Sequence, residues 1–551
     1  MMIKKITLII LALFSQIGFS QTNLTETQKL AATCKVWGFL KYYHPKVANG
    51  DFDWDKQFLE VLPKVEQAKT KEEFSKILEN WINSLGEIKQ IAPIVKPKEI
   101  EYFDKNFDLS WFSDTKVFSK NISQKLKFIE ENRFQGNQHY VGSELAENIF
   151  VKNENYAEFK FSDKNLRILA LFTYWNLMEY FFPYKYLMDI KWDVTLEEML
   201  PIFLKATNND DFYLAMKKLT VRLNDSHVVF YKYEKKRHFL PVACEIIDEK
   251  MVVAKILDNF FLKNESLKVG VVITKINDKT IKEIIFENRD LIPASNEALY
   301  LNRLVEHALS GYSDEIKLQI LANGKTISKI INWTDYNLNS YELNQILKIK
   351  NKNDKFKILE NNIGYVNMGN IYVKHIPEMI AALESTKAII FDMRNYPNET
   401  YDAISKFLNS KEKNFAIYTK PDLTYPGKFK WSEPQPTGSE NPNNYKGKVI
   451  ILLNEESMSQ SEWTAMCFQT AGNTTIIGSQ TAGADGNVTN IDYMKAFHSS
   501  FSGIGVYYPD KRETQRIGII PDIEVKPTIK GIQEGKDEVL QRAIKFIETG
   551  K

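Results

Sequence analysis

The sequence predicts an α/β fold of several domains, in which helical and β-rich regions precede an α/β core. The chain has 551 residues, of which 44% are hydrophobic and 26% charged, as in ordinary globular proteins. An internal repeat of helical character occupies much of its first half. Residues 355–547 then alternate between strand and helix signals, which is typical of an α/β domain.

Residues 1–20 are expected to be a secretory signal peptide. Lys4 and Lys5 precede a short apolar run, and small residues surround the expected cleavage point after Ser20. The run is too short to span a bilayer, so we expect a periplasmic or extracellular protein without an integral membrane span. Removal of both lysines leaves 70 of the 72 basic residues against 70 acidic ones. This balance argues against general binding to nucleic acid.

Residues 21–160 and 161–237 are expected to be helical regions built on one repeat. Aromatic and proline positions recur at a constant offset of 138 residues, as in the pairs Trp37 and Trp175, Trp54 and Trp192, and Phe74 and Phe212. We expect each copy to form a helical hairpin that buries its aromatic residues. Only the second copy ends in Ser226-His227, and a purely structural histidine has less reason to occur in one copy alone.

Residues 238–335 are expected to form a small β-rich module. In residues 267–281, Gly270 precedes an apolar strand, a polar turn and an isoleucine. The pattern resembles the PDZ fold, which receives a peptide as an added strand.

Within residues 355–547, buried strands are expected near 388–395 and 449–453. Residues 419–447 are rich in Pro, Gly, Asn and Ser and are expected to be an exposed loop. The second strand leads into Ser457-Met458-Ser459-Gln460-Ser461-Glu462 and then into a helix. From these residues alone two interpretations stand. The serines cap the helix, or one of them is a nucleophile beside a helix N-terminus that stabilises an oxyanion.

The order of these motifs resembles that of the C-terminal processing, or tail-specific, serine peptidases and their tricorn-core relatives. The order is Asp-Ser-His at 225–227, the PDZ-like module, Phe-Asp-Met-Arg-Asn at 391–395, the serine motif at 457–462 and Gly-Ile-Ile-Pro-Asp-Ile at 518–523. The resemblance covers about residues 160–547. It implies a crotonase-like α/β peptidase core at 355–547 with a PDZ domain.

By motif, the resemblance makes Ser459 the nucleophile. The better-known branch of the family places a lysine base after a Thr-x-Gly turn, but here Thr481-Ala482-Gly483 is followed by alanine. The tricorn-like branch uses a Ser-His pair, which Ser226-His227 matches. A serine hydroxyl needs a neighbouring base, and neutral imidazole can accept and return its proton. We expect Ser226 to orient the imidazole of His227.

The resemblance also implies a supporting carboxylate and an oxyanion hole. The family places a glutamate shortly before the Gly-x-x-Pro-Asp turn. Here the spacing points to Gln515, with Glu513 two residues away, and both could instead be exposed edge residues. The oxyanion donors are expected to be the N–H groups of Gln460 and of Asn398 or Glu399, which stand where the family has two glycines.

We therefore expect a secreted serine endopeptidase that acts on peptides or unfolded protein segments, with no predicted oligomeric state. The cysteines are scattered and the seven histidines isolated, so neither a disulfide framework nor a metal or organic cofactor is predicted. Two rivals stay open. One is an inactive relative that binds peptides in the PDZ-like groove, which the missing glycines favour. The other is a carrier with a large cavity for apolar ligands.

Overall fold

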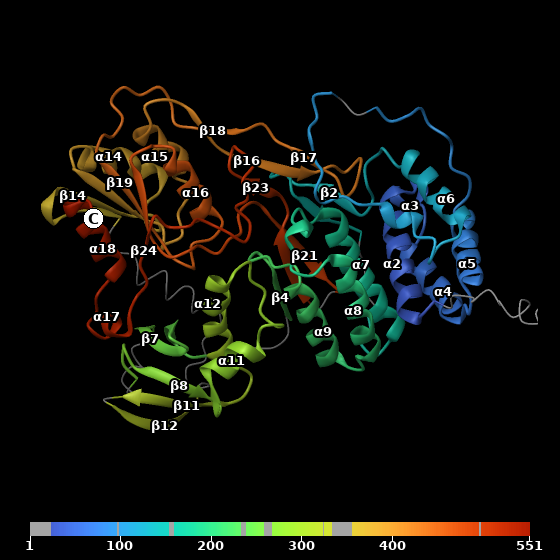
Figure 1. Cartoon of the computed structure of the whole chain (residues 1–551), viewed down its shortest axis with the longest axis horizontal. Coiled ribbons are helices and arrows are strands. Elements are labelled where there is room, and N and C mark those ends of the chain that lie inside the picture. The colour runs from blue at the N-terminus through green and yellow to red at the C-terminus, as the bar shows by residue number, and fades with distance from the viewer. Residues whose placement is uncertain are drawn as a thin grey trace, which may run out of the picture.

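The computed structural model describes residues 24–95, 98–153, 159–232, 238–257, 267–322, 324–332, 355–494 and 497–551. The expected signal peptide at 1–20 lies outside these ranges. Figure 1 shows the helical region on one side, the α/β core on the other, and the β-rich module below the core. None of the described helices is long and apolar enough to cross a membrane.

The helical region consists of two matching sets of three helices. The first set is α2 (Glu26–Tyr43), α4 (Trp54–Gln67) and α5 (Lys71–Ser84), and the second is α7 (Lys164–Phe181), α8 (Trp192–Lys205) and α9 (Asn209–Val221). Each helix of the second set begins 138 residues after its counterpart. The sequence pattern predicted a two-helix hairpin for each copy and missed the third helix. That helix carries only one matched aromatic residue, Phe74 in the first set and Phe212 in the second.

The matched tryptophans make matched contacts inside this region. The indole N–H of Trp54 donates to the carbonyl of Trp37 at 3.1 Å, and that of Trp192 to the carbonyl of Trp175 at 3.0 Å. Both contacts join the first helix of a set to the second. The two sets then share one hydrophobic core, which also includes residues of the neighbouring sheets.

The segment between the two sets, for which the sequence predicts no element, connects them to the core. It contains β1 (Tyr102–Phe103), α6 (Lys120–Glu131), β2 (Val141–Ser143) and β3 (Ile149–Val151), whereas the short α3 (Pro45–Ala48) lies inside the first set, between α2 and α4. In β1, Tyr102 lies opposite Lys430 of the core. The Asn148 amide donates to the carbonyl of Val488 at 3.2 Å. The helical region is therefore attached to the core at several separate points.

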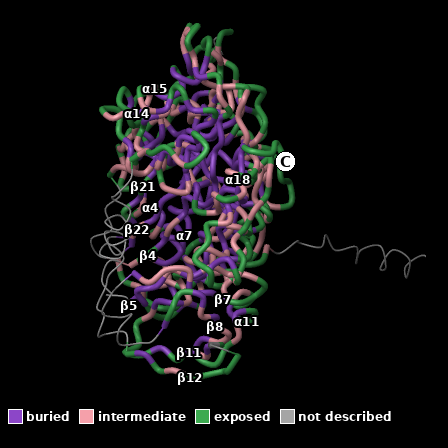
Figure 2. The backbone as a smooth tube through the Cα atoms, turned by 90° about the vertical axis from the view of Figure 1, so that its left-hand side faces the viewer, coloured by how far each residue is buried: buried purple, intermediate pink, exposed green. Residues whose placement is uncertain are grey.

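The β-rich module has an antiparallel sheet of order β12-β11-β8-β7-β6. Its elements are β6 (Val242–Ile247), β7 (Lys250–Ile256), β8 (Val272–Ile276), β9 (Lys279–Thr280), β11 (Glu315–Ala322), β12 (Lys325–Asn332), α11 (Ile281–Glu287) and α12 (Glu297–Ala308). Figure 2 shows this module at one end of the molecule, where β12 is largely exposed. At the opposite edge, β6 pairs only with β7 among the described strands.

The core is a six-stranded sheet of order β13-β14-β15-β19-β20-β24. Its strands are β13 (Phe356–Leu359), β14 (Ile363–Asn367), β15 (Ala388–Asp392), β19 (Lys448–Leu453), β20 (Thr474–Gly478) and β24 (Ile523–Glu524). All neighbours after β13 are parallel. One face packs on α14 (Ile376–Leu383), α15 (Tyr401–Leu408) and α16 (Gln460–Gln469), and the other on α18 (Glu538–Thr549). The expected α/β multidomain fold is confirmed.

The expectation of an exposed loop at 419–447 was partly wrong. The segment contains the end of β16 (Lys413–Pro421) together with β17 (Phe429–Trp431) and β18 (Gln435–Thr437). These strands pair with one another, with β1 and with β23 (Gly505–Tyr507). Composition favoured a loop, but partners remote in sequence supply the hydrogen bonds that make these residues strands.

A third sheet joins the end of the second helical set to the core. Strand β4 (Val229–Lys232) pairs with β22 (Phe497–Ser502), which pairs with β21 (Val488–Tyr493). Residue His227 lies just before β4, and the hydroxyl of Ser500 donates to its backbone carbonyl at 2.6 Å. The pairing therefore fixes the position of the histidine relative to the core.

Candidate active site

Ser459 lies where β19 ends and α16 begins. Its backbone has φ +56° and ψ −116°, which is a strained conformation for a residue other than glycine. The N–H of Ser459 donates to the carbonyl of Ala484 at 2.9 Å and to the Glu462 carboxylate at 3.2 Å. This sharp turn presents the serine at the N-terminus of a helix, where unpaired N–H groups favour negative charge.

The neighbouring serines have a different environment. Ser457 and Ser461 are each 1% exposed, and both hydroxyls donate to the carbonyl of Met393, at 3.2 and 3.3 Å. They fasten the start of α16 to the end of β15. Ser459 is only partly buried and borders a cavity, so it is the serine of the three that a substrate can reach.

The Glu462 side chain holds the turn at Ser459 in place through hydrogen bonds. Its carboxylate accepts from the hydroxyl of Thr481 and from the N–H groups of Ser459, Gly483 and Ala484. Burial raises the pKa of Glu462 to about 7, while the four donors favour its ionised form. One buried side chain thus joins the turn of Ser459 to residues 481–484.

His227 is buried and lies at the start of a hydrogen-bonded chain. Its Nδ1 lies 2.9 Å from the Oγ of Ser502, and that hydroxyl donates to the Oδ1 of Asp225 at 2.9 Å. Because the hydroxyl proton goes to the carboxylate, Ser502 accepts from Nδ1–H, and this order assigns the lone pair to Nε2. Nε2 is buried without a partner among the described residues. The imidazole is therefore oriented to accept a proton at Nε2.

Burial favours the neutral form of this imidazole. Burial lowers the pKa of His227, and the nearby charge of Asp225 opposes that shift. Asp225 also accepts from the N–H of His227 at 3.0 Å and from the N–H of Ser502 at 2.7 Å. The carboxylate thus holds both members of the chain and favours the imidazolium when a proton arrives.

Ser226 does not hold the imidazole, contrary to the expectation from the resemblance. Its hydroxyl donates to the carbonyl of Ala482 at 2.8 Å and accepts from the N–H of Ser295 at 2.8 Å. The residue that contacts the ring is Ser502. Nothing in the sequence marked Ser502, whereas Asp225 stood in the Asp-Ser-His motif without a role.

Of the two candidates for the supporting carboxylate, only Gln515 reaches this chain. Its amide donates to Oδ1 of Asp225 at 3.1 Å, and the residue is 1% exposed. Glu513 instead accepts from the hydroxyl of Tyr186 at 2.7 Å and lies 3.5 Å from Lys105. Here the charge comes from Asp225, and Gln515 supports it as a neutral donor.

The three oxyanion candidates differ in position. Gln460 is the first residue of α16 and borders the same cavity as Ser459, as does Glu399. Glu399 has φ +37°, so it adopts the left-handed backbone that glycine would take more easily. The side-chain amide of Asn398 donates to the carbonyls of Gly369 at 2.9 Å and Ile371 at 3.2 Å. Asn398 therefore braces a neighbouring turn.

The turn at 481–485 connects the loop of Ser459 with the loop of His227. The carbonyl of Ala482 accepts from Ser226, and its N–H donates to the carbonyl of Ser457 at 3.0 Å. Ala484 accepts from the N–H of Ser459. The cavity at Ser459 has a volume of about 520 Å³, and His227 is not among its lining residues. The histidine and the serine are thus held on two sides of one short turn.

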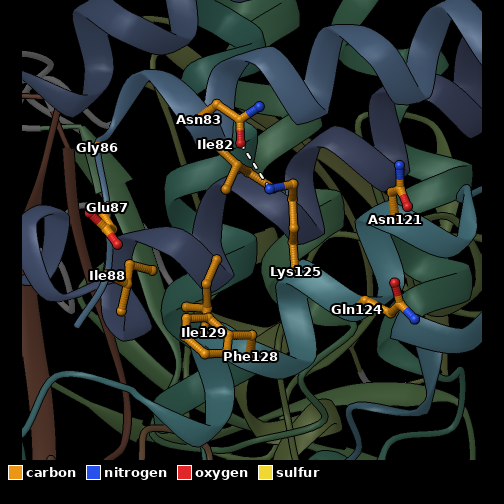
Figure 3. Close-up of a pocket in the computed structure, with 10 residues that line it drawn as sticks. All are labelled: Ile82, Asn83, Gly86, Glu87, Ile88, Asn121, Gln124, Lys125, Phe128 and Ile129. Atoms are coloured by element: carbon orange, nitrogen blue, oxygen red, sulfur yellow. Dashed lines mark hydrogen bonds between the residues drawn. The ribbon is translucent and has the colours of Figure 1, made fainter. Parts of the chain in front are cut away.

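A second cavity, of about 820 Å³, lies in the first helical set (Figure 3). It is lined by the end of α5, the residues that follow it, and α6, with Lys125 donating to Asn83 at 2.9 Å. It shares no lining residue with the cavity at Ser459. Its wall mixes polar groups such as Glu87 and Gln124 with apolar ones, so it does not match the apolar cavity that a lipophilic carrier requires.

Within the described ranges, no group of three His, Cys, Asp or Glu residues could hold a metal ion.

Residues 362–525 match the model of peptidase family S41. The structure of mature CPAF complexed with lactacystin has a TM-score of 0.56, with 12% identity over 69% of this chain and 98% of that one. The photosystem II D1 C-terminal processing protease has a TM-score of 0.39, with 14% identity over 67% of this chain and 98% of its own. The tricorn protease has a TM-score of 0.34, with 14% identity over 73% of this chain and 37% of its own. No curated protein sequence matches the chain.

Proposed function

We propose a mechanism from one premise, that this chain is a serine-type peptidase whose core belongs to family S41, the family of the C-terminal processing serine peptidases. Its substrates are peptides or proteins. We infer that it is an endopeptidase of the Ser-His type, with Ser459 as nucleophile and His227 as base. The single observation that carries this proposal is the chain from His227 through Ser502 to Asp225, which leaves Nε2 free to accept a proton.

In this mechanism, the Oγ of Ser459 attacks the scissile carbonyl carbon while its proton passes to Nε2 of His227. The imidazolium is stabilised by Asp225 through Ser502. It returns the proton to the leaving amine as the peptide bond breaks and an acyl-enzyme forms. Water then attacks the ester, again with His227 as base. Ser502 and Asp225 are positioning residues, since they act through the imidazole.

Negative charge on the carbonyl oxygen needs donors that are already in place. The backbone N–H of Gln460 at the start of α16 is one of them. Glu399 borders the cavity from another element, and we assign its N–H as the second donor. The left-handed backbone of Glu399 supports this assignment, because it gives a non-glycine residue the conformation that the family's glycines would supply.

The β-rich module is proposed to bind an extended peptide as a PDZ domain does. Its strand β6 is an edge strand beside α12, which supports addition of a peptide strand. Helix α12 also contacts the active site, because Arg303 donates to the backbone carbonyls of Ser226 and of Val228, the latter at 3.2 Å. A peptide held at β6 would thus lie beside α12, the helix whose Arg303 holds the backbone on both sides of His227. Residues 1–20 are proposed to direct export to the periplasm or outside the cell and to be removed from the mature protein.

Labelling with a fluorophosphonate probe tests the nucleophile. We expect covalent labelling of the full chain at Ser459, loss of labelling in Ser459→Ala, and retention in Ser410→Ala, an exposed serine of a core loop. His227→Ala should label far more slowly while Ser459 is still present. Folded wild-type protein that fails to label would contradict the proposal and favour a peptide-binding relative without catalysis.

A further inference from the structure

We infer that the cavity beside Ser459 is a subsite for a cationic substrate side chain, arginine or lysine, with Asp485 as its anionic partner. The inference deepens the proposed function and rests on it. The cavity has a volume of about 520 Å³ and includes Ser459 and Gln460 in its wall. A side chain adjacent to the scissile bond would therefore enter it.

The wall of the cavity is acidic. Among its described lining residues are Glu147, Glu399, Asp402 and Asp485, and no lysine or arginine. Glu147 already accepts from the hydroxyl of Tyr418 and from an ammonium group, that of Lys420. Asp402 is half-exposed and pairs with Lys406 at 2.7 Å one turn further along α15. Glu399 and Asp485 are the two carboxyl groups left to face an incoming charge.

Asp485 is the buried member of this group. It is 3% exposed, and its Oδ1 accepts from the N–H of Gly486 at 2.7 Å. Its Oδ2 is buried without a hydrogen-bond partner in the part of the chain that the structure describes. A buried carboxylate without a counter-charge is costly, because burial removes its hydration without replacing it. A cationic ligand would supply the missing partner.

The titration of Asp485 agrees with this reasoning. Burial, reinforced by the nearby charge of Glu462, raises the pKa of Asp485 well above its ordinary value. The neutral acid is therefore favoured while no cation is bound, because the residues around Asp485 do not compensate its ionised form. A guanidinium or ammonium group at Oδ2 would stabilise that form, and the interaction would be strong because the cavity shields it from water.

The aromatic residues of the wall favour the same class of ligand. The rings of Tyr401, Tyr418 and Trp463 border the cavity together with Asp485. Cations are attracted to the faces of such rings, and the planar guanidinium of arginine also stacks on them. A carboxylate combined with aromatic walls is therefore suited to a long basic side chain, whose methylene groups pack while its end pairs with the charge.

The subsite is also tied to the nucleophile by the chain itself. Asp485 directly follows Ala484, whose carbonyl accepts from the N–H of Ser459. The same turn carries Gly483 and Ala484, whose N–H groups donate to Glu462. Recognition and chemistry thus share one turn.

Equilibrium binding separates this inference from catalysis. The full chain carrying Ser459→Ala is titrated with N-acetyl-arginine amide and with N-acetyl-citrulline amide, which has nearly the same shape without the charge. We expect the arginine compound to bind on the order of tenfold more tightly, and this preference to disappear in Asp485→Asn. The matched control is Asp510→Asn, a half-exposed aspartate that pairs with Arg512 outside the cavity and should keep the preference.

Hydrolysis gives the second readout. Peptides that differ only by arginine or citrulline before the scissile bond should show the same ratio in kcat/KM, and Glu399→Gln should reduce that ratio less than Asp485→Asn does. If Asp485→Asn fails to fold, as judged by thermal unfolding, Glu399→Gln and the arginine–citrulline comparison in the parent protein still decide the question. Equal binding of the two compounds to the parent protein would overturn the subsite. If Ser459 is labelled by the fluorophosphonate but the arginine and citrulline compounds bind equally, the subsite is overturned and the proposed function stands.

Discussion

Replacing Ser502 with alanine tests the base assignment most directly, because its hydroxyl connects the imidazole to Asp225. The substitution removes the 2.9 Å contact at Nδ1 and the 2.9 Å hydrogen bond to the carboxylate. It leaves Nδ1–H buried without a partner, which costs about 1–3 kcal/mol, and it frees the ring to adopt the other tautomer. A loss of about 3 kcal/mol in transition-state stabilisation corresponds to roughly a 100-fold decrease in kcat/KM.

Steady-state hydrolysis of a fluorogenic peptide measures this effect, with the fall expected in kcat and little change in KM. Ser502→Thr keeps the hydroxyl and should recover most of the activity, which a purely structural role would not predict. Ser500→Ala is the matched control, since Ser500 lies on the same strand and its hydroxyl donates to the backbone carbonyl of His227 instead of contacting the ring. If Ser502→Ala stays within threefold of the parent enzyme while Ser226→Ala abolishes activity, the assignment is refuted and Ser226 is the residue that orients the base.

Four further outcomes are expected. The acid limb of the kcat/KM profile should fall below the ordinary histidine pKa of 6.5, because burial lowers the pKa of His227 and the base stays neutral to lower pH; a midpoint above 6.5 would contradict this. The same lowered pKa means that the unfolded chain binds the proton first, so the free energy of unfolding should decrease as pH falls through 6.5, and His227→Gln should reduce that dependence. Glu462→Gln replaces a carboxylate that accepts from four donors, and it should lower the free energy of unfolding in urea by about 3 kcal/mol. A decrease below about 1 kcal/mol would show that the turn at 481–484 is stable without this carboxylate. Trp192→Phe removes the indole donor to the Trp175 carbonyl and should cost about 1–2 kcal/mol by the same measurement, with activity on small peptides unchanged.

Much of the core could be predicted because its signals are local. The apolar runs of β15 and β19 are continuous, as expected for strands that a parallel sheet buries on both faces. The serine motif then follows the second run directly, so strand, turn and helix could be placed from one stretch of sequence. Likewise, the constant offset of 138 residues was sufficient by itself to identify the helical repeat.

The remaining site residues depend on contacts that no local pattern reveals. Ser502 lies 275 positions from His227, on a strand whose register against β4 brings the two together. Asp225 was visible in the sequence, but its role depends on accepting from Ser502 and Gln515 at once. The family resemblance assigned the contact with the imidazole to Ser226, whereas the structure gives it to Ser502, because a resemblance transfers positions in a motif and not the direction of a side chain.

The repeat explains why a histidine loop could arise in the second copy. Both third helices are followed within three residues by a residue with left-handed backbone, Gly86 with φ +87° and Asn224 with φ +48°, at equivalent positions. In the first copy the next residues, Glu87 and Ile88, border the open cavity of Figure 3.

In the second copy the equivalent residues are Asp225 and Ser226, which are fully buried against the core and the β-rich module. The same helical ending therefore borders a cavity in the first copy and forms the proposed catalytic loop in the second, where the core and the β-rich module pack on it. The chemistry depends on that packing, since Ser502, Ala482 and Ser295, which hold this loop, all come from outside the repeat. The helical set with His227 should then have no peptidase activity when it is expressed without the core, and addition of the core as a separate chain should restore activity only if β4 pairs again with β22.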